Sequence, residues 1–419
     1  MLAARWKTCL RPMREITLMS ARMKNYLFHG SLGVLIFTAA FHSSAAPQWI
    51  KPDAKRGASL AVVAENVPLA HTTQFLPLDK NEKLVGEGNA AKQIQQTLSN
   101  LENALKAADS GLDQIVKLNV VVAKNEVAME VEKVLAKKFK KEPPAVSFVM
   151  GGLPHIDALV AMDAVAQCKV SRPMKQITVA KLEGDKAFAH VRSLTVGGVV
   201  YISGQARPGE LAEATTKTME SLVETLKFLK LEISDVVQIK SFIHPAGNAE
   251  VAKKEIAKFY KGGTVPPLVF VDWISPKLPI EIEMIVAAPE NREANESVSF
   301  ITPPWFQPSN VYCKVTRVNY GRQVYISGLY GTTPENPEQQ ILEIFESLKQ
   351  ITQEAGSDFD SLAKATYYAS SLEASGKLNV LRPKYYNPKR PPAASKALVK
   401  GTGRAGMSVT LDMIAVTEK

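Results

Sequence analysis

The stretch Ser193-Leu-Thr-Val-Gly-Gly-Val-Val-Tyr-Ile-Ser-Gly204 decides the fold. Apolar and polar side chains alternate on both sides of a glycine pair, which predicts a β-hairpin that turns at Gly197 and Gly198. Part of the stretch recurs later, because Gln323-Val-Tyr-Ile-Ser-Gly328 matches Val199-Val-Tyr-Ile-Ser-Gly204. A recurring strand motif indicates that the chain repeats a larger unit.

The residues after the hairpin predict two helices and three more strands. One helix over 210–230 places Met219, Leu222, Leu226 and Leu229 on one face. The second helix, 249–260, has Val251, Ile256 and Phe259 available for burial. The strands are expected over 235–243, 265–273 and 279–287. The predicted order of the unit is therefore β-β-α-β-α-β-β.

Two further copies of this unit share one period. The prolines Pro144, Pro267 and Pro392, each before an expected strand, are 123 and 125 residues apart. The third copy has a helix with Ile341, Phe345, Leu348 and Ile351 and a strand over 362–369, and the first has a helix with Ile94, Leu98, Leu101 and Leu105 and strands over 115–122 and 145–150. Proline pairs, helices and strands at a common spacing predict three tandem domains, 55–170, 175–290 and 300–419. Polar, proline-bearing joints over 167–176 and 289–303 fit this division.

Residues 1–46 have the pattern of a secretory signal. Six basic residues and one acidic residue accompany an apolar run over 26–41, which small residues follow up to Ala46. This pattern predicts export with cleavage near Ala45, to a secreted or periplasmic location, and Met19 and Met23 are alternative starts. The run is slightly short for a membrane span, which favours cleavage over the alternative of an uncleaved N-terminal anchor.

Charge and cysteine content exclude several classes of function. Without the leader, 45 basic and 40 acidic residues remain, and a net charge of +5 is too mild to argue for nucleic-acid binding. Cys168 and Cys313 could pair in an oxidising compartment or remain as two buried thiols. We expect no metal and no cofactor, because no cluster has metal-ligand spacing and no glycine-rich loop has phosphate-binding spacing.

Four motifs of the middle copy carry a family resemblance. They are Gly197–Gln205, the helix 210–230, Asp235-Val236-Val237 and Pro279–Glu283. The third copy matches at Tyr325–Gly328, Gln339-Gln340, Pro391–Ala393 and Asp412–Val416, and the first keeps Gln95-Gln96, Asn100-Leu101 and Pro143–Ala145. In these motifs the chain resembles the RidA family, also called YjgF or endoribonuclease L-PSP, over nearly all of its length after residue 55.

The resemblance implies an α+β fold of chorismate-mutase type, with two helices on one face of a mixed sheet. Family members assemble as homotrimers whose ligand sites lie in clefts between subunits. Three fused copies then suggest an intramolecular pseudo-trimer, a monomer with internal three-fold pseudo-symmetry. Fusion would raise the effective concentration of neighbouring copies.

The family's best-known activity is the hydrolytic deamination of enamines and imines such as 2-aminoacrylate. Its substrate carboxylate needs a cation, and arginine suits the bidentate geometry. In the family this arginine follows Pro-Ala inside the penultimate strand, a position that corresponds here to Val146, Leu268 and Ala394. A site without this cation is expected to bind the family's substrate poorly.

Other positions assigned by the resemblance are altered too. The family's last-strand glutamate corresponds to Ala161, Glu281 and Thr410, and its first-strand tyrosine corresponds to Ser59, His190 and Lys314. The family's Ser-Gly-Gln corner corresponds to Thr72-Thr73-Gln74, Ser203-Gly204-Gln205 and Ser327-Gly328-Leu329. The middle copy therefore keeps more of the family's site residues than the other two copies.

Glu281 and Ser203 are the candidate catalytic residues. Glu281 could position a water as in the family, although a strand glutamate can simply face solvent. The candidate ligand-binding residues are His190, Gly204, Gln205, Lys314, Ser327 and Lys396.

Two of these candidates carry specific hypotheses. His190 could be a general acid or base, or a buried or exposed histidine without a role. Lys396 follows Ala394 by two residues and so shares its face of the strand. With Lys314 and Ser327 it could hold an anionic ligand. The alternative is a solvated basic loop, because residues 382–404 contain seven cations and no acid.

Three functions compete at this stage. The first is a noncatalytic member of the family that keeps the scaffold for small-molecule binding or protein interaction. The second is a divergent hydrolase of the enamine or imine deaminase type. The third, an RNA-cleaving protein, is disfavoured by the leader and the mild charge. The sequence does not name a ligand or decide between the first two.

Overall fold

The computed structural model describes residues 47–168, 176–177, 187–275 and 277–418. All of them lie within one unit, Ser44–Lys419. The expected leader, residues 1–46, lies outside the described residues, as does most of the joint expected over 167–176. None of the described helices is long and apolar enough to cross a membrane.

Three stretches of the described chain show the same order of elements: three strands, a helix, a strand, a helix and two strands. Segment one comprises β1 (Gln48–Asp53), β2 (Ala58–Val63), β3 (Leu69–Thr72), α1 (Ala90–Ala107), β4 (Ile115–Val122), α2 (Asn125–Lys138), β5 (Ala145–Met150) and β6 (Val160–Gln167). Segment two comprises β7 (Gln176–Ile177), β8 (Val191–Leu194), β9 (Gly198–Gln205), α3 (Leu211–Phe228), β10 (Val236–Ile243), α4 (Ala249–Lys258), β11 (Leu268–Asp272) and β12 (Ile280–Ala288). Segment three comprises β13 (Val298–Ile301), β14 (Val315–Val318), β15 (Arg322–Ile326), α5 (Pro337–Glu354), β16 (Leu362–Ala369), α6 (Leu372–Leu381), β17 (Ala393–Leu398) and β18 (Val409–Thr417). The first strand of each segment, β1, β7 or β13, was not predicted from the sequence.

The helices form where apolar spacing and capping residues predict them. Asn89 caps α1 by accepting a hydrogen bond from the Lys92 amide, and Asn336 caps α5 in the same way. The predicted apolar faces of both helices are buried. In α4, however, Val251 is 39% exposed, so the expectation that it is buried was wrong.

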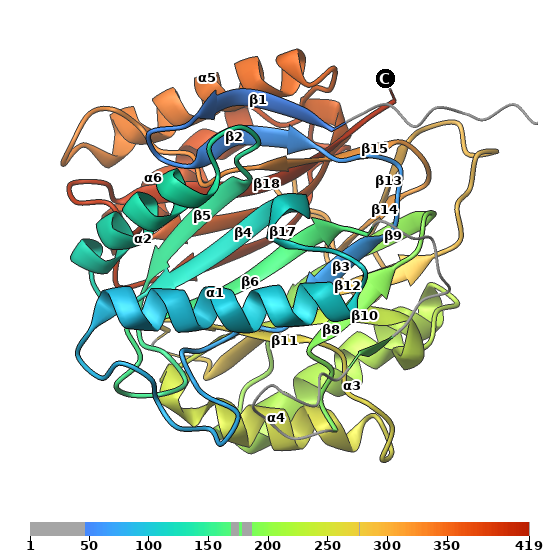
Figure 1. The fold of residues 1–419 in the computed structure, drawn as a ribbon. Coiled ribbons are helices and arrows are strands. Elements are labelled where there is room, and N and C mark those ends of the chain that lie inside the picture. The colour runs from blue at the N-terminus through green and yellow to red at the C-terminus, as the bar shows by residue number, and fades with distance from the viewer. Residues whose placement is uncertain (1–46, 169–175, 178–186, 276, 419) are drawn as a thin grey trace, which may run out of the picture. The chain divides into compact units, whose positions relative to one another are not determined.

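Each segment builds a mixed sheet with its two helices on one face. In segment two, β10 pairs parallel with β11 and antiparallel with β12, and the same pattern recurs around β4 and β16. The long helices α1, α3 and α5 contact β6, β12 and β18. An apolar core lies under the helices of each segment, and strand residues of a neighbouring segment contribute to it. Figure 1 shows α5 and α6 against the strands of segment three, and α3 and α4 against those of segment two.

The predicted hairpin at Gly197-Gly198 does not form. Strand β8 pairs with β3 of segment one, whereas β9 pairs with β12 and with β14 of segment three. A Cβ atom on Gly198 would lie 2.7 Å from the carbonyl oxygen of Pro289 and 2.9 Å from that of Val318. Glycine is therefore needed here for close backbone approach, and the bend sends its two strands to different partners.

Three antiparallel ladders join the segments in a closed cycle. They are β3 with β8 between segments one and two, β9 with β14 between two and three, and β15 with β2 between three and one. We call these the one/two, two/three and three/one seams. The described strands form a twelve-stranded and a six-stranded sheet, and one further apolar core contains residues of all three segments.

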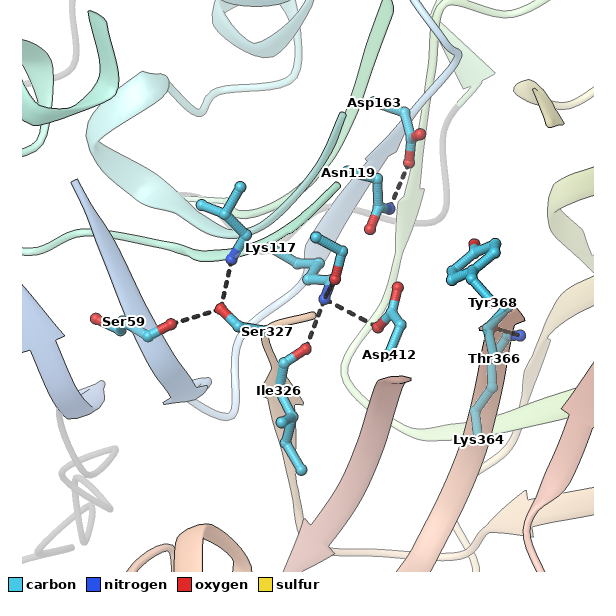
Figure 2. Close-up of polar contacts among 12 residues, drawn as sticks. Ser59, Lys117, Asn119, Asp163, Ile326, Ser327, Lys364, Thr366, Tyr368 and Asp412 are labelled. Atoms are coloured by element: carbon cyan, nitrogen blue, oxygen red, sulfur yellow. Dashed lines mark hydrogen bonds and ion pairs between the residues drawn. The ribbon is translucent and has the colours of Figure 1, made fainter. Parts of the chain in front are cut away.

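Serine hydroxyls bridge two of the seams. Ser203 Oγ donates to the Cys313 carbonyl at 2.5 Å and accepts from the Ala394 amide at 2.7 Å. Ser327 Oγ donates to the Ser59 carbonyl at 2.5 Å and accepts from the Val146 amide at 2.7 Å. Figure 2 shows the Ser327–Ser59 contact. Both hydroxyls are buried and saturate backbone groups of the neighbouring segment.

The cysteines and prolines occupy defined places. Cys168 and Cys313 are both free and buried, so the alternative of two unpaired thiols is the observed one. The prolines at 144, 267 and 392 immediately precede β5, β11 and β17, as predicted.

Replacing Ser327 by alanine is expected to destabilise the protein. The substitution leaves the buried Val146 amide without its acceptor, which costs about 1–3 kcal/mol. Urea unfolding monitored by circular dichroism measures the change. Ser99→Ala, on the exposed face of α1, is the matched control and should stay within about 0.5 kcal/mol of the parent. Equal stability of the two variants would contradict a seam role for Ser327.

Candidate functional site

A cavity of about 350 Å³ opens at the one/two seam. The end of β3, the residues before β8, strand β11 and helix α4 build its walls. The lining residues are Thr73, Gln74, Phe75, Leu76, Leu78, Glu82, Pro154, His155, Phe188, Ala189, His190, Ala249, Glu250, Lys253, Leu268 and Phe270. A cavity of this volume holds a small molecule.

Aromatic rings dominate the inner wall of this cavity. The rings of Phe75 and His190 stack with centroids 6.0 Å apart, and both residues are buried. The Lys253 ammonium lies 5.2 Å from the centroid of the Phe188 ring and pairs with Glu250 at 2.6 Å. This lysine is therefore paired with a carboxylate of its own helix. The walls offer apolar contact and ring stacking more than a free charge.

The polar groups beside β11 are largely committed to the backbone. The side-chain amide of Gln74 bonds the backbone of Phe270 twice. Its Nε2 donates to the Phe270 carbonyl at 2.9 Å, and its Oε1 accepts from the Phe270 backbone amide at 3.3 Å. Thr73 Oγ1 donates to the Leu268 carbonyl at 2.9 Å. These bonds hold β11 against the end of β3 and fix the shape of the cavity.

Leu268, which the resemblance places at the family's arginine position, lines this cavity. None of the described lining residues is an arginine, so these residues offer no guanidinium for bidentate pairing with a carboxylate. The corresponding residues at the other two seams, Val146 and Ala394, are buried at the start of β5 and β17.

Most of the other candidate residues meet at the two/three seam. The first three are Ser203 and Gly204 from β9 and Glu281 from β12, and the fourth is Lys314, the residue before β14. A Cβ atom on Gly204 would lie 1.9 Å from Glu281 Oε1, so only glycine leaves room for this carboxyl group. Ser395 Oγ accepts from the Gly204 amide at 3.2 Å. The carboxyl of Glu281 thus packs directly against the corner motif.

Burial raises the pKa of Glu281 to about 7, although a hydrogen bond with Ser395 and the charge of Lys314 act in the opposite direction. A carboxyl group that titrates near neutrality can give or accept a proton under ordinary conditions. Ser203, by contrast, uses its hydroxyl for the backbone bonds at the seam, and it is not poised as a nucleophile.

The two lysines of this seam have local partners. Lys314 Nζ donates to Tyr312 Oη at 3.1 Å and lies 4.7 Å from the centroid of the Phe306 ring. Lys396 Nζ donates to Asn379 Oδ1 at 2.9 Å, and burial lowers its pKa while Glu281 acts to raise it. Lys396 is therefore close enough to Glu281 to feel its charge, but it is held by α6.

Three predicted residues lie outside this group. His190 lines the one/two cavity, and Ser327 bridges the three/one seam. Gln205 donates to Thr225 Oγ1 at 3.0 Å, within the core between β9 and α3. The predicted residues therefore lie in four separate places, and they do not form one site.

The observed register corrects one set of correspondences. The amides of Thr73, Ser203 and Ser327 bond the carbonyls of His190, Lys314 and Leu60. Thr73, and not the expected Thr72, therefore corresponds to Ser203. Leu60, and not the expected Ser59, corresponds to His190 and Lys314. A degenerate first segment gave no motif that could fix this register.

Four residues of the cavity wall were not predicted from the sequence: Phe75, Phe188, Lys253 and Phe270. One signal could have revealed Phe270, because it follows Leu268 by two residues as Lys396 follows Ala394. The same face of the strand should therefore have been considered in segment two. Within the described ranges, no three or more His, Cys, Asp or Glu side chains are grouped so that they could hold a metal ion.

Comparison with known proteins gives consistent matches. The family model of endoribonuclease L-PSP matches residues 53–168 and 305–417. The RutC family protein UK114 of Drosophila melanogaster is 37% identical over 107 residues, 25% of this chain and 75% of that protein. The 3-aminoacrylate deaminase RutC of Acinetobacter baylyi is 29% identical over 106 residues, 25% of this chain and 82% of that protein. A crystal structure of yeast Mmf1 is 27% identical and covers 30% of this chain and 100% of its own, with a TM-score of 0.23.

Glu281→Gln is expected to remove part of the pH dependence of stability. A carboxyl whose pKa is raised on folding binds a proton that the unfolded chain releases between its ordinary pKa of 4.5 and about 7. The parent protein should therefore lose stability as pH rises through this window, by about 1–2 kcal/mol after allowance for partial exposure. The variant should match the parent at pH 4 and exceed it at pH 8.

Urea unfolding at a series of pH values measures this difference. Glu220→Gln, on the exposed face of α3, is the control and should follow the parent throughout. A Glu281→Gln profile parallel to that of the parent would show that this carboxyl titrates normally.

Proposed function

Because the chain belongs to the endoribonuclease L-PSP family, we propose that it uses the family scaffold to bind a small, largely apolar molecule at the one/two seam. The observation that carries the proposal is the 350 Å³ cavity with aromatic walls and a leucine at the arginine position. The resemblance implies that family ligands occupy clefts between neighbouring units, and this cavity lies between two segments.

We propose further that the chain contains three tandem family domains that act as one intramolecular pseudo-trimer, a monomer in solution. The three cyclic ladders support this proposal, because each segment completes its sheet with a strand of the next. The equivalent hydrogen bonds of Thr73, Ser203 and Ser327 at the three seams support it as well. Export after removal of the leader is part of the same proposal, and it rests on the pattern of residues 1–46.

The chemistry of the cavity favours a neutral or weakly cationic aromatic ligand over a carboxylate. Its charged lining groups are Glu82, Glu250 and Lys253, and the lysine is paired with Glu250. The rings of Phe75, Phe188, Phe270 and His190 offer stacking surfaces to a planar molecule. A leucine at the family's arginine position is expected to shift the preferred ligand from a carboxylate to an apolar ring.

Indole and benzoate are suitable probes of this preference. The mature protein should bind indole more tightly than benzoate in isothermal titration calorimetry. Leu268→Arg should reverse the order, with benzoate affinity rising about tenfold or more, because a guanidinium–carboxylate pair contributes about 1.5–3 kcal/mol.

Leu372→Arg is the matched control for this experiment, because Leu372 is 78% exposed on α6 and the variant adds the same charge. It should leave both affinities unchanged. Tighter binding of benzoate by the parent protein, or indole binding that Leu268→Arg does not alter, would contradict the proposed ligand class.

A divergent enamine or imine deaminase is the second candidate, and Glu281 is the observation that favours it. The resemblance implies that the family's last-strand glutamate serves the reaction, and Glu281 is a buried carboxyl with a pKa near 7 beside the Gly204 corner. The relative in Acinetobacter baylyi is named as a 3-aminoacrylate deaminase. At this seam, too, the resemblance places an alanine, Ala394, at the family's arginine position.

Ammonia release from freshly generated 2-aminoacrylate tests this candidate directly. A deaminase would exceed the rate in buffer and lose that excess in Glu281→Ala, whereas the surface variant Glu220→Ala would retain it. We expect the parent protein to show no excess, in agreement with a binding function. An excess rate that depends on Glu281 would replace that function by the hydrolytic one.

A further inference from the structure

A second cavity, of about 50 Å³, lies among charged side chains of all three segments. Three lysines and three carboxylic acids face it from the central strands of each sheet. They are Lys117, Lys240 and Lys364 from β4, β10 and β16, and Asp163, Glu283 and Asp412 from β6, β12 and β18. We call these six residues the central cluster. None of them lines the one/two cavity, so the two cavities are separate sites.

Two lysines of the central cluster form ion pairs across seams. Lys117 Nζ lies 2.9 Å from Asp412 Oδ1, and Lys364 Nζ lies 2.7 Å from Glu283 Oε1. Lys117 also donates to the Ile326 carbonyl and to Ser147 Oγ, and Figure 2 shows this lysine between Ile326 and Asp412. Each lysine is thus bound to the carboxylate of the preceding segment in the cycle. Both lysines and both carboxylates therefore already have ionic partners.

The third pair of the cycle is missing. Each carboxylate of the cluster has a residue directly opposite it in the antiparallel ladder of its own segment. The pairs are Asp163 with Asn119, Glu283 with Lys240, and Asp412 with Thr366. The residues two positions earlier are Lys117, Gln238 and Lys364, so a glutamine replaces the lysine in segment two. Gln238 donates to the Thr72 carbonyl at 2.8 Å. Asp163 consequently accepts from Asn119 of its own segment at 2.8 Å, and no ion pair forms within the described residues.

Lys240 is the cation left over from this arrangement. Its ammonium donates to Tyr368 Oη at 2.8 Å, and within the described part of the chain it has no carboxylate within ion-pair distance. Burial acts to lower the pKa of Lys240. The opposing effect of Tyr368, Glu283 and Asp412 is larger in sum and raises this pKa above its ordinary value, so Lys240 stays protonated. An ammonium group has three N–H donors, and the bond to Tyr368 uses one of them.

His71 opens the space beside this lysine. In the corrected register, His71 stands two residues before Thr73, as Tyr201 and Tyr325 stand before Ser203 and Ser327. The smaller imidazole leaves room that a tyrosine would fill. His71 is 1% exposed and lines the cavity, and neither ring nitrogen has a hydrogen-bond partner among the described residues. Burial lowers its pKa to about 4, so the ring is neutral and offers one N–H donor.

We propose that the central cavity is a binding site for one small monovalent anion of the size of chloride, held by Lys240 and His71. Two independent observations carry this proposal: an ammonium group without a counter-ion, and a fully buried imidazole without a partner, both facing one cavity. Thr366 lines the same cavity and adds a hydroxyl group. A buried charge needs a partner, and a halide supplies one with several acceptor directions.

The charge of the cluster makes the site dependent on pH. The ionisable groups that line the cavity are the six residues of the cluster, His71 and Tyr325, and Tyr368 adjoins Lys240. Burial raises the pKa of Asp163 to about 6, with Asn119 and Lys240 acting against the rise. Below pH 6 Asp163 is protonated and adds no negative charge beside Lys240, which favours an anion in the cavity. Above pH 6 Asp163 ionises and adds a negative charge that repels an anion, so the anion is expected to leave.

Anomalous scattering from bromide tests the site directly. Crystals of the mature protein grown with sodium bromide at pH 5.5 should show an anomalous peak beside Lys240 and His71, and crystals at pH 8 should show at least fivefold lower occupancy. Lys240→Met should remove the peak at pH 5.5. Lys377→Met, which alters an exposed lysine on α6, should retain it.

A second variant restores the missing pair and guards against misfolding of the first. Gln238→Lys gives Asp163 the partner that Asp412 and Glu283 already have, so it should abolish the bromide peak at pH 5.5. In solution, the midpoint of thermal unfolding should rise in sodium chloride over sodium gluconate of equal ionic strength at pH 5.5, and not at pH 8. Density for water without an anomalous peak at pH 5.5 would overturn the proposal, as would a peak that survives in Lys240→Met or Gln238→Lys.

Discussion

The antiparallel ladders across the three seams are the interaction on which the rest of the structure depends. Because β8 and β9 leave their common bend for different neighbours, no segment keeps its whole strand set for itself. Each seam has main-chain hydrogen bonds, and two of them have a buried serine that ties two backbones together. The cavity at the one/two seam and the Glu281 corner at the two/three seam are both consequences of this exchange, since each is walled by two segments.

The three seams have diverged although they share one geometry. One carries an open aromatic cavity, and another is filled by a carboxyl group that leaves no room for a Cβ atom on the facing residue. At the third seam, Leu60 and Val146 occupy the positions that correspond to His190 and Leu268 at the one/two seam. Both side chains there are apolar. The buried ion pairs between segments have diverged as well. A charge can be buried among the segments only where an opposite charge is in contact with it. A single glutamine in the cycle therefore changes the chemistry of the centre.

The sequence predicted the elements better than it predicted their partners. Helical faces, the strands after each proline pair and the family resemblance could all be inferred from periodicity and motifs, which are local properties. The hairpin prediction was wrong because alternation around Gly197-Gly198 is the same whether a strand pairs with its neighbour or with a distant segment. The register of the first segment was displaced by one residue for a related reason, since only the ladder to β8 fixes it.

Site prediction failed in a similar way. Ser203 and Gln205 match a family motif, but the first is consumed by backbone bonds across the seam and the second faces a helix. The aromatic wall formed by Phe75, Phe188 and Phe270 has no linear motif, because its residues come from two segments almost two hundred positions apart. The lysines of the centre recur along the chain, but their offset in segment two is visible only in the strand register.

The exchange of strands also has a consequence during synthesis on the ribosome. Strand β2 completes its pairing with β15, where Val63 stands opposite Val324. Most of the chain must therefore leave the ribosome before the first sheet can close. Contacts of such large sequence separation slow folding and leave strand edges exposed meanwhile. A nascent chain of this architecture is a natural client for chaperones that shield unpaired edges until the last segment arrives.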